Sequence, residues 1–210
     1  MSRTMSHCNG SLMVGIGLRT NGPDHNEHQI FQVAFAPLDS DLNINKDYVP
    51  LLLKIRPDNP GHFDKAFIKK LGIPLELYYD CCETGVDQNA ASLLIESWVE
   101  RVITYTKFGI PRKIIPISVD YSNTKIFMEN LLMKIVYDEL FHHDFRDPRL
   151  VALYINDKQA FHAEKAPYGD TRIQLISSKH NMAMGREYNL MNRTLNSVRL
   201  YKDMCQKGFF

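Results

Sequence analysis

Histidine and cysteine side chains are the first candidates for chemistry, because they ligate transition metals and act as acids, bases or nucleophiles. The eight histidines include an adjacent pair, His142–His143, and a loop pair, His25 and His28. Neither pair has further ligands at the spacing of a zinc motif, so we interpret both as solvated. The four cysteines form no CxxC pair, which predicts reduced thiols in a cytosolic setting. They are Cys8, Cys81, Cys82 and Cys205.

The segment 14–35, VGIGLRTNGPDHNEHQIFQVAF, is a second place where chemistry is conceivable. An apolar run ends in the turn residues 20–22, and a second strand-like run begins at Ile30. Carboxylates at alternate positions of such a strand hold divalent cations in many nucleases. Here those positions are Gly17, which offers no ligand atom, and Arg19, whose fixed charge about 4 Å from a metal repels it by several kcal/mol.

Length and composition predict one domain with a substantial core. Of the 210 residues, 44% are hydrophobic. We expect a loose leader over 1–11, a single domain over 12–204 and a short tail over 205–210. The formal net charge of +1 predicts neither avid binding of polyanions nor attachment to a membrane. No apolar run has the length of a membrane span and the start has no secretory h-region, which favours a cytoplasmic protein.

Hydrophobic periodicity predicts the elements that position these residues. Three consecutive strands form an antiparallel meander, a fourth strand follows two helices, and two long amphipathic helices come later. In the helix expected over 123–139, Ile135 is placed on the buried side. In the closing helix expected over 183–204, Arg186, Arg193 and Arg199 are placed in solvent. Residues 149–154 suit either a fifth strand or a helix start, and 161–174 reads as irregular. The strands are 12–18, 30–37, 48–55 and 113–119, and the helices are 63–71, 87–99, 123–139 and 183–204.

Several short signatures follow one another in a fixed order. Ile16–Gly22 stands where a pattern apolar-Asp-apolar-Glu-Thr-Thr-Gly is expected, with Gly17, Arg19 and Asn21 departing from it, and Ile30–Ala34 matches Ile-x-Gln-apolar-Ala. Asn123–Met128 has the outline of Phe-Asp-x-x-Phe-Leu, and Lys179–Gly185 that of His-x-x-x-x-Asp. This order resembles the DnaQ-like (DEDDh-type) 3′–5′ exonucleases of the ribonuclease H-like fold. Further matches are Leu71-Gly72-Ile73 to a Gly-Ile pair after a helix, and Phe145–Arg149 to an Arg-Asp-x-Arg segment.

The resemblance implies an α/β fold with a mixed central sheet of about five strands flanked by helices, and with Ile16–Leu18 on a central strand. In the family, four carboxylates hold two divalent cations and a histidine acts as general base. Carried over by position, the carboxylates become glycine, arginine, threonine and glycine, and only the histidine remains. No metal or cofactor is therefore expected. The five positions, which should converge on one cleft, are Gly17, Arg19, Thr124, Gly185 and His180.

Other carboxylates would have to move to rebuild the metal site. Asp120 precedes Thr124 by four positions, and Asp24 and Glu27 lie in a loop. Glu187 is two positions past Gly185 and therefore points elsewhere on a helix. An active exonuclease with these relocated ligands is the least favoured of three hypotheses.

Two hypotheses without catalysis remain. The near-neutral charge favours a protein-interaction platform, of a size that would suit a bacteriophage-encoded factor in a host cytoplasm. The alternative is a module that binds single-stranded DNA or RNA in the former active-site cleft. That cleft would be lined by Arg19, Asn21, Lys179, His180 and Arg186. His180 is otherwise expected to cap or pack a helix.

Overall fold

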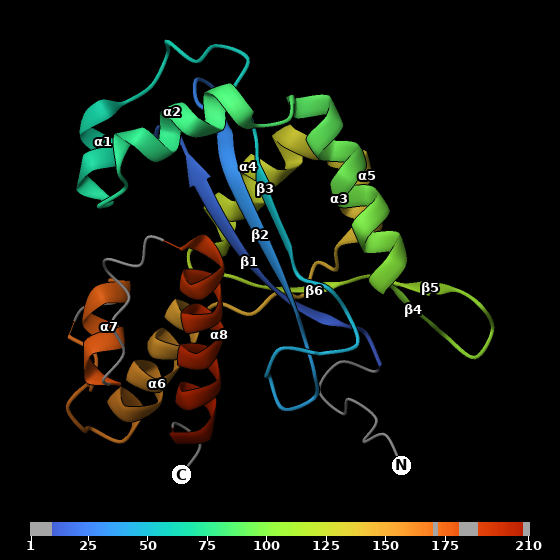
Figure 1. The fold of residues 1–210 in the computed structure, drawn as a ribbon. Coiled ribbons are helices and arrows are strands. Elements are labelled where there is room, and N and C mark those ends of the chain that lie inside the picture. Colours follow the sequence, from blue (N-terminus) through green and yellow to red (C-terminus); the bar gives the residue numbers. More distant parts are fainter. Residues whose placement is uncertain (1–9, 170–171, 181–188, 208–210) are drawn as a thin grey trace.

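The computed structural model describes residues 10–169, 172–180 and 189–207. Most of the predicted leader, Cys8, Gly185, Arg186 and Glu187 lie outside the described residues. The centre of the molecule is a four-stranded sheet of order β3-β2-β1-β6 (Figure 1). The bounds of its strands are Met13–Thr20 for β1, Ile30–Leu38 for β2, Leu51–Lys54 for β3 and Ile115–Ile117 for β6.

The pairing of these strands confirms the predicted mixed sheet with β1 inside it. β1 pairs antiparallel with β2 and parallel with β6, and β2 pairs antiparallel with β3. All nine residues of β2 are buried, as expected for a strand covered on both faces. Ile16 and Phe35 pack into the main core with Trp98, on the face covered by α3 (Gln88–Val102) and α4 (Tyr121–Leu132).

The sheet has four strands where about five were expected. The place beside β6 is occupied by the segment 141–146, which makes only two isolated parallel bridges, Ile114–Phe141 and Ile117–Arg146. The ambiguous run 149–154 is helical and belongs to α6 (Pro148–Phe161). Asp147 caps this helix, and Pro148 suits its first turn, where no backbone N–H is needed.

The predicted helix over 87–99 is confirmed as α3, and the Asp87 side chain accepts from Ala90 N at its start. The predicted helix over 123–139 is instead two helices, α4 and α5 (Lys134–Leu140). They separate at Met133, whose φ of 61° no α-helix accommodates. Ile135, expected in the core, is 76% exposed because the break turns α5 away.

Five short elements were not predicted or differ from prediction. α1 (Lys65–Lys70) is shorter than the run 63–71, and α2 (Leu75–Thr84) follows it. A small hairpin pairs β4 (Thr104–Tyr105) with β5 (Pro111–Arg112), and α7 (Ile173–Lys179) begins within the run expected to be irregular.

The closing helix α8 (Leu190–Lys207) continues past the predicted domain end at 204. It packs on β1 and β2, and α6 and then α7 pack behind it (Figure 1). Together with α3 and α4 on the opposite face, these helices make the layers that surround the sheet.

Candidate functional site

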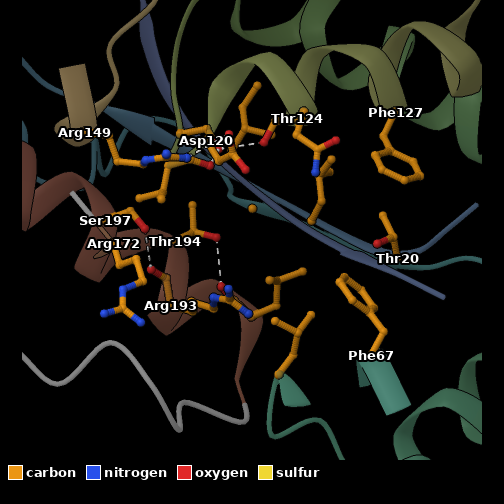
Figure 2. A pocket seen from close by; sticks show the side chains of 18 residues that line it. Thr20, Phe67, Asp120, Thr124, Phe127, Arg149, Arg172, Arg193, Thr194 and Ser197 are labelled. Carbon is orange, nitrogen blue, oxygen red and sulfur yellow. Dashed lines mark hydrogen bonds and ion pairs between the residues drawn. The ribbon is translucent and has the colours of Figure 1, made fainter. Parts of the chain in front are cut away.

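A cleft of about 380 Å³ opens beside the second half of β1. Its walls come from β1, from the first turns of α4 and α6, from α1 and from α8 (Figure 2). In this view the arginines Arg149, Arg172 and Arg193 lie on one side of the cleft, and Phe67 and Phe127 on the other. The cleft thus opens at the central strand and includes Gly17 and Thr124, two of the five positions that the resemblance marks.

Gly17 lies at the floor of the cleft and faces α8. A Cβ atom at this position would be 2.0 Å from Thr194 Oγ1 and 3.2 Å from Leu190 Cδ1. Two residues earlier, on the same face of β1, a Cβ at Gly15 would be 2.8 Å from Val198 Cγ2. The two glycines thus let α8 approach the sheet more closely than any other residue type would allow. The space that a side chain at position 17 needs is occupied by Thr194.

The start of α4 brings neutral hydroxyl groups and one carboxylate to the cleft. Thr124 is buried, and its hydroxyl hydrogen-bonds with that of Ser118 at 3.0 Å. Asp120 stands at the N-terminus of α4 with a φ of 56° and forms an ion pair with Arg149 at 3.0 Å. Among the described residues that line the cleft, Asp120 is the only carboxylate.

The arginines make the cleft cationic. Arg149 pairs with Asp120, whereas no hydrogen bond or ion pair of the Arg193 guanidinium is found among the described residues. Burial lowers the pKa of Arg193, although a guanidinium stays charged at any physiological pH. The sequence placed Arg193 in solvent; it is half-buried against the cleft instead. A desolvated cation of this kind is stabilised by an anion that enters the cleft.

The five positions predicted to converge do so only in part. Gly17 and Thr124 line the cleft. Arg19 lies on the same strand but is 2% exposed, and its Nη1 donates to Gln32 Oε1 at 2.8 Å on the neighbouring strand. Arg19 does not line the cleft, because its long side chain runs over β2. Gly185 lies outside the described residues.

His180 is not at the cleft. It follows α7, where its ring hydrogen-bonds with the hydroxyl of Tyr168 at 2.8 Å and contacts the carboxylate of Asp203 on α8. These contacts fit the packing role that the sequence favoured. Lys179 is exposed and lies over the Tyr168 ring, 5.4 Å from its centroid.

Asn21 is also structural. Its side chain is 2% exposed, donates to the carbonyl of His62 at 2.8 Å and accepts from Gln29 N at 2.7 Å. Of the four residues within the described ranges that were predicted to contact nucleic acid, namely Arg19, Asn21, Lys179 and His180, none lines the cleft.

The placement of α8 identifies what sequence reasoning missed. The helix that packs on β1 begins at Leu190, and Asn189 caps it by accepting from Met191 N at 2.9 Å. Thr194, five residues after Asn189, is the residue that faces Gly17. Asn189 and Thr194 also have the His-x-x-x-x-Asp spacing, and Thr194 lines the cleft whereas His180 does not. A capping asparagine before the amphipathic run was the available signal.

The carboxylates considered as relocated ligands do not gather in the cleft. Asp24 is in the β1–β2 loop, where the backbone N–H of Asn26 lowers the pKa of its carboxyl group. Glu27 lies in the same loop, at a separate cleft. Asp120 alone is at the central cleft, and Glu187 lies outside the described residues.

Comparisons with known proteins relate the fold to nucleases. No family model matches the sequence, and no curated protein matches it. Among solved structures, the chain is similar to exonuclease I of E. coli in complex with a 5cy-dT13 oligonucleotide, with 13% identity and a TM-score of 0.66 over 94% of the chain. The chain covers 41% of exonuclease I, well under half of its length.

Two further structures are similar over most of the chain. The nuclease domain of 3′hExo, a DEDDh family member bound to rAMP, is 14% identical with a TM-score of 0.62, and 94% of this chain covers 93% of that domain. A 3′-exonuclease that recognises the 3′ end of a histone mRNA stem-loop is 15% identical with a TM-score of 0.63, over 94% of this chain and 64% of that one.

These similarities define the class of fold. The central sheet and its flanking helices form the ribonuclease H-like fold of the DEDDh exonucleases, as the sequence resemblance implied. Identities of this size establish the fold alone, since one fold hosts many functions. Within the described part of the chain, none of the helices combines the length and apolar character that crossing a membrane requires.

Proposed function

We propose that the central cleft binds single-stranded nucleic acid without hydrolysing it. The observation that carries this proposal is the charge of the cleft. Three arginines, Arg149, Arg172 and Arg193, face a space in which the described residues provide one carboxylate, and that carboxylate is already paired. Guanidinium groups suit phosphate oxygens because their planar N–H donors match two oxygens at once.

The shape of the cleft supports a single strand. Phe67 lies across the cleft from the arginines and is half-buried, so part of its side chain is open to a base that enters the cleft (Figure 2). Arginines that hold the phosphates, with an aromatic ring for a base, are the combination that single-strand binding proteins use. Among the similar structures, exonuclease I is in complex with an oligonucleotide, the 3′hExo domain is bound to rAMP, and a 3′-exonuclease recognises the 3′ end of a histone mRNA stem-loop, which agrees with this ligand class.

The same residues support the proposed absence of hydrolysis. Two-metal hydrolysis requires several carboxylates that hold the cations on either side of the reacting phosphate. Position 17 offers no ligand atom and no space for one, and Thr124 offers a neutral hydroxyl that Ser118 engages. The arginines supply fixed positive charge in place of a cation, so phosphate binding does not depend on metal.

The local charge also changes the preference between the two hypotheses without catalysis. A net charge of +1 favoured a protein-interaction platform. The net charge of the whole chain does not describe the cleft, because three arginine side chains line that one place. The binding hypothesis therefore takes precedence, with cleft residues that differ from those expected.

A pair of assays tests the proposal. Fluorescence anisotropy with a labelled single-stranded oligonucleotide in EDTA should show saturable binding that weakens as salt rises, because phosphate contacts release counterions. The same oligonucleotide incubated with Mg²⁺ or Mn²⁺ should remain intact on a denaturing gel. Metal-dependent digestion, or no binding in EDTA at low salt, would contradict the proposal.

A protein platform remains a second candidate, because α6 exposes apolar side chains. Leu150, Leu153, Tyr154 and Phe161 are 43–89% exposed along this helix. Exposed apolar patches of this kind mark contact sites for other proteins. Capture from native lysate before and after nuclease treatment separates the candidates: a partner that stays bound after nuclease treatment favours the platform.

A further inference from the structure

A second cleft, of about 370 Å³, contains side chains of metal-ligating types. Glu27 and His28 belong to the β1–β2 loop, and His62 lies between β3 and α1. One ligand atom from each of the three lies within 4.8 Å of the others. The sequence led us to interpret His28 as solvated, because its partner His62 is far away along the chain.

The distances suit a small cation. His62 Nε2 and Glu27 Oε2 are 4.0 Å apart. Two ligands bonded to a tetrahedral zinc at 2.0–2.1 Å lie about 3.4 Å apart. The side chains of His62 and Glu27 are 51% and 64% exposed, so small rotations can close the remaining gap.

The surroundings of His28 fix its ring in the form that a metal requires. Its Nδ1 lies 3.1 Å from the backbone carbonyl of Asp24, which only accepts, so Nδ1 carries the proton and Nε2 keeps its lone pair. A ring nitrogen bonded to a carbonyl is the usual outer support of a metal-ligating histidine. The ring also stacks on His62, with centroids 5.4 Å apart. It lies against Gly22, where a Cβ would be 2.0 Å from its Cδ2 and 2.1 Å from its Nε2, so the absence of a side chain at Gly22 is what leaves room beside that nitrogen.

The second histidine is held through its backbone. The carbonyl of His62 accepts from the buried side chain of Asn21 at 2.8 Å, and the backbone N–H of His62 donates to Asn59 O at 3.0 Å. Asn21 also accepts from Gln29 N in the β1–β2 loop. The two segments that supply the ligands are thus already joined before any cation binds.

The other cluster of this kind lacks such support. His142, His143 and Asp144 are adjacent in sequence and also have ligand atoms within 4.8 Å. Nδ1 of His142 accepts from the backbone N–H of Asp144 at 3.0 Å. That bond uses the lone pair and places the proton on Nε2, so neutral His142 has no nitrogen left for a metal. This cluster serves as the matched control.

We propose that Glu27, His28 and His62 form a Zn²⁺ site with three protein ligands and a fourth position open to water. Two imidazoles and one carboxylate select zinc over Mg²⁺ or Ca²⁺, which prefer oxygen ligands alone. The ion would link the β1–β2 loop to the segment before α1. Phe127 lines both clefts, so this site would lie next to the central cleft while remaining independent of its ligand.

Cobalt and zinc titrations of the metal-free protein test the site. Co²⁺ should give the visible absorption of a tetrahedral complex at one equivalent, and Zn²⁺ should displace it. His62→Ala and Glu27→Ala should each weaken Zn²⁺ binding at least about tenfold, whereas His142→Ala should leave it unchanged. The side chains of His62 and Glu27 are exposed, so His62→Ala and Glu27→Ala should keep the melting temperature of the metal-free protein. Absence of saturable binding, unchanged binding in His62→Ala, or loss of binding in His142→Ala would overturn the proposal.

Discussion

A Cβ atom on residue 17 would lie 2.0 Å from Oγ1 of Thr194, so Gly17 and Thr194 exclude any larger side chain from the floor of the cleft. The hydroxyl of Thr194 donates to the carbonyl of Leu190 at 2.8 Å, which holds it in this position. The closing helix therefore occupies the point where the resemblance places the first metal ligand. Restoring a carboxylate there therefore also requires the Thr194 side chain to move or to change.

Gly17→Ala should lower the free energy of unfolding by about 1–3 kcal/mol, because the new methyl group overpacks the interface between β1 and α8. Urea denaturation monitored by circular dichroism measures the change. Gly169→Ala is the control, since nothing lies within 4 Å of a Cβ at Gly169.

Adding Thr194→Ala to Gly17→Ala should restore part of the lost stability. The nearest remaining atoms would be Leu190 Cδ1 and the Cβ of residue 194, at 3.2 and 3.3 Å, which a small adjustment accommodates. A double variant no more stable than Gly17→Ala would show that the close contact with Thr194 is not the cause.

The sequence predicted the centre of this arrangement and missed its contacts. Short apolar runs on either side of the turn after Thr20 identified β1 and β2, and the Asp87 cap identified α3. Arg19 was misplaced because its partner Gln32 depends on the register of a hairpin. A strand position fixes only which face a side chain leaves from, and the course of a long side chain depends on its neighbours.

The sequence also did not show which residues of the closing helix face β1. His180–Gly185 and Asn189–Thr194 both have the five-residue spacing of the motif, and a short motif cannot distinguish them. Only the packing of α8 against the glycines of β1 does so. The split at Met133 had no signal either, because a positive φ at a methionine is imposed by tertiary structure.

Asp147 joins two helices, and its removal should be costly. The buried carboxylate accepts from Arg149 N at the start of α6 and from Tyr121 N at the start of α4, at 2.8 and 3.0 Å. Asp147→Ala should lower the free energy of unfolding by about 2 kcal/mol, since one cap is lost and a buried N–H is left without an acceptor.

Asp147→Asn tests the reason for this loss. The amide retains one accepting oxygen of the two, so its free energy of unfolding should fall between those of the wild type and Asp147→Ala. Equal values for the two variants in urea denaturation would argue that the hydrogen bonds are not the source of the effect.

Buried tyrosines predict loss of stability at alkaline pH. Burial raises the pKa of Tyr78 and of Tyr121 from 10.0 to about 12, and burial also raises the pKa of Tyr137, which hydrogen-bonds to Tyr121. Tyrosines of the unfolded chain ionise first. The stabilisation is therefore fully present below pH 10 and is lost as pH rises from 10 to 12.

Urea denaturation at fixed pH values between 9 and 12 should show a fall of about 1–3 kcal/mol over the upper two pH units. The double variant Tyr121→Phe/Tyr137→Phe should have a shallower pH dependence. Tyr105→Phe, at a position that is 59% exposed, should keep the slope of the wild type. A double variant with an unchanged slope would assign the alkaline loss to other groups.

The comparison of Arg193→Ala with Arg199→Ala tests the central claim most directly. Both arginines belong to α8, but Arg193 lines the cleft whereas Arg199 is exposed and donates to Asn196 Oδ1. Each variant is titrated against the same labelled single-stranded oligonucleotide in EDTA at fixed salt. Arg193→Ala should weaken binding by about 1–3 kcal/mol, the scale of a charge-assisted hydrogen bond, and Arg199→Ala should bind like the wild type. Equal affinity of the two variants would place the nucleic acid elsewhere and contradict the account of the cleft.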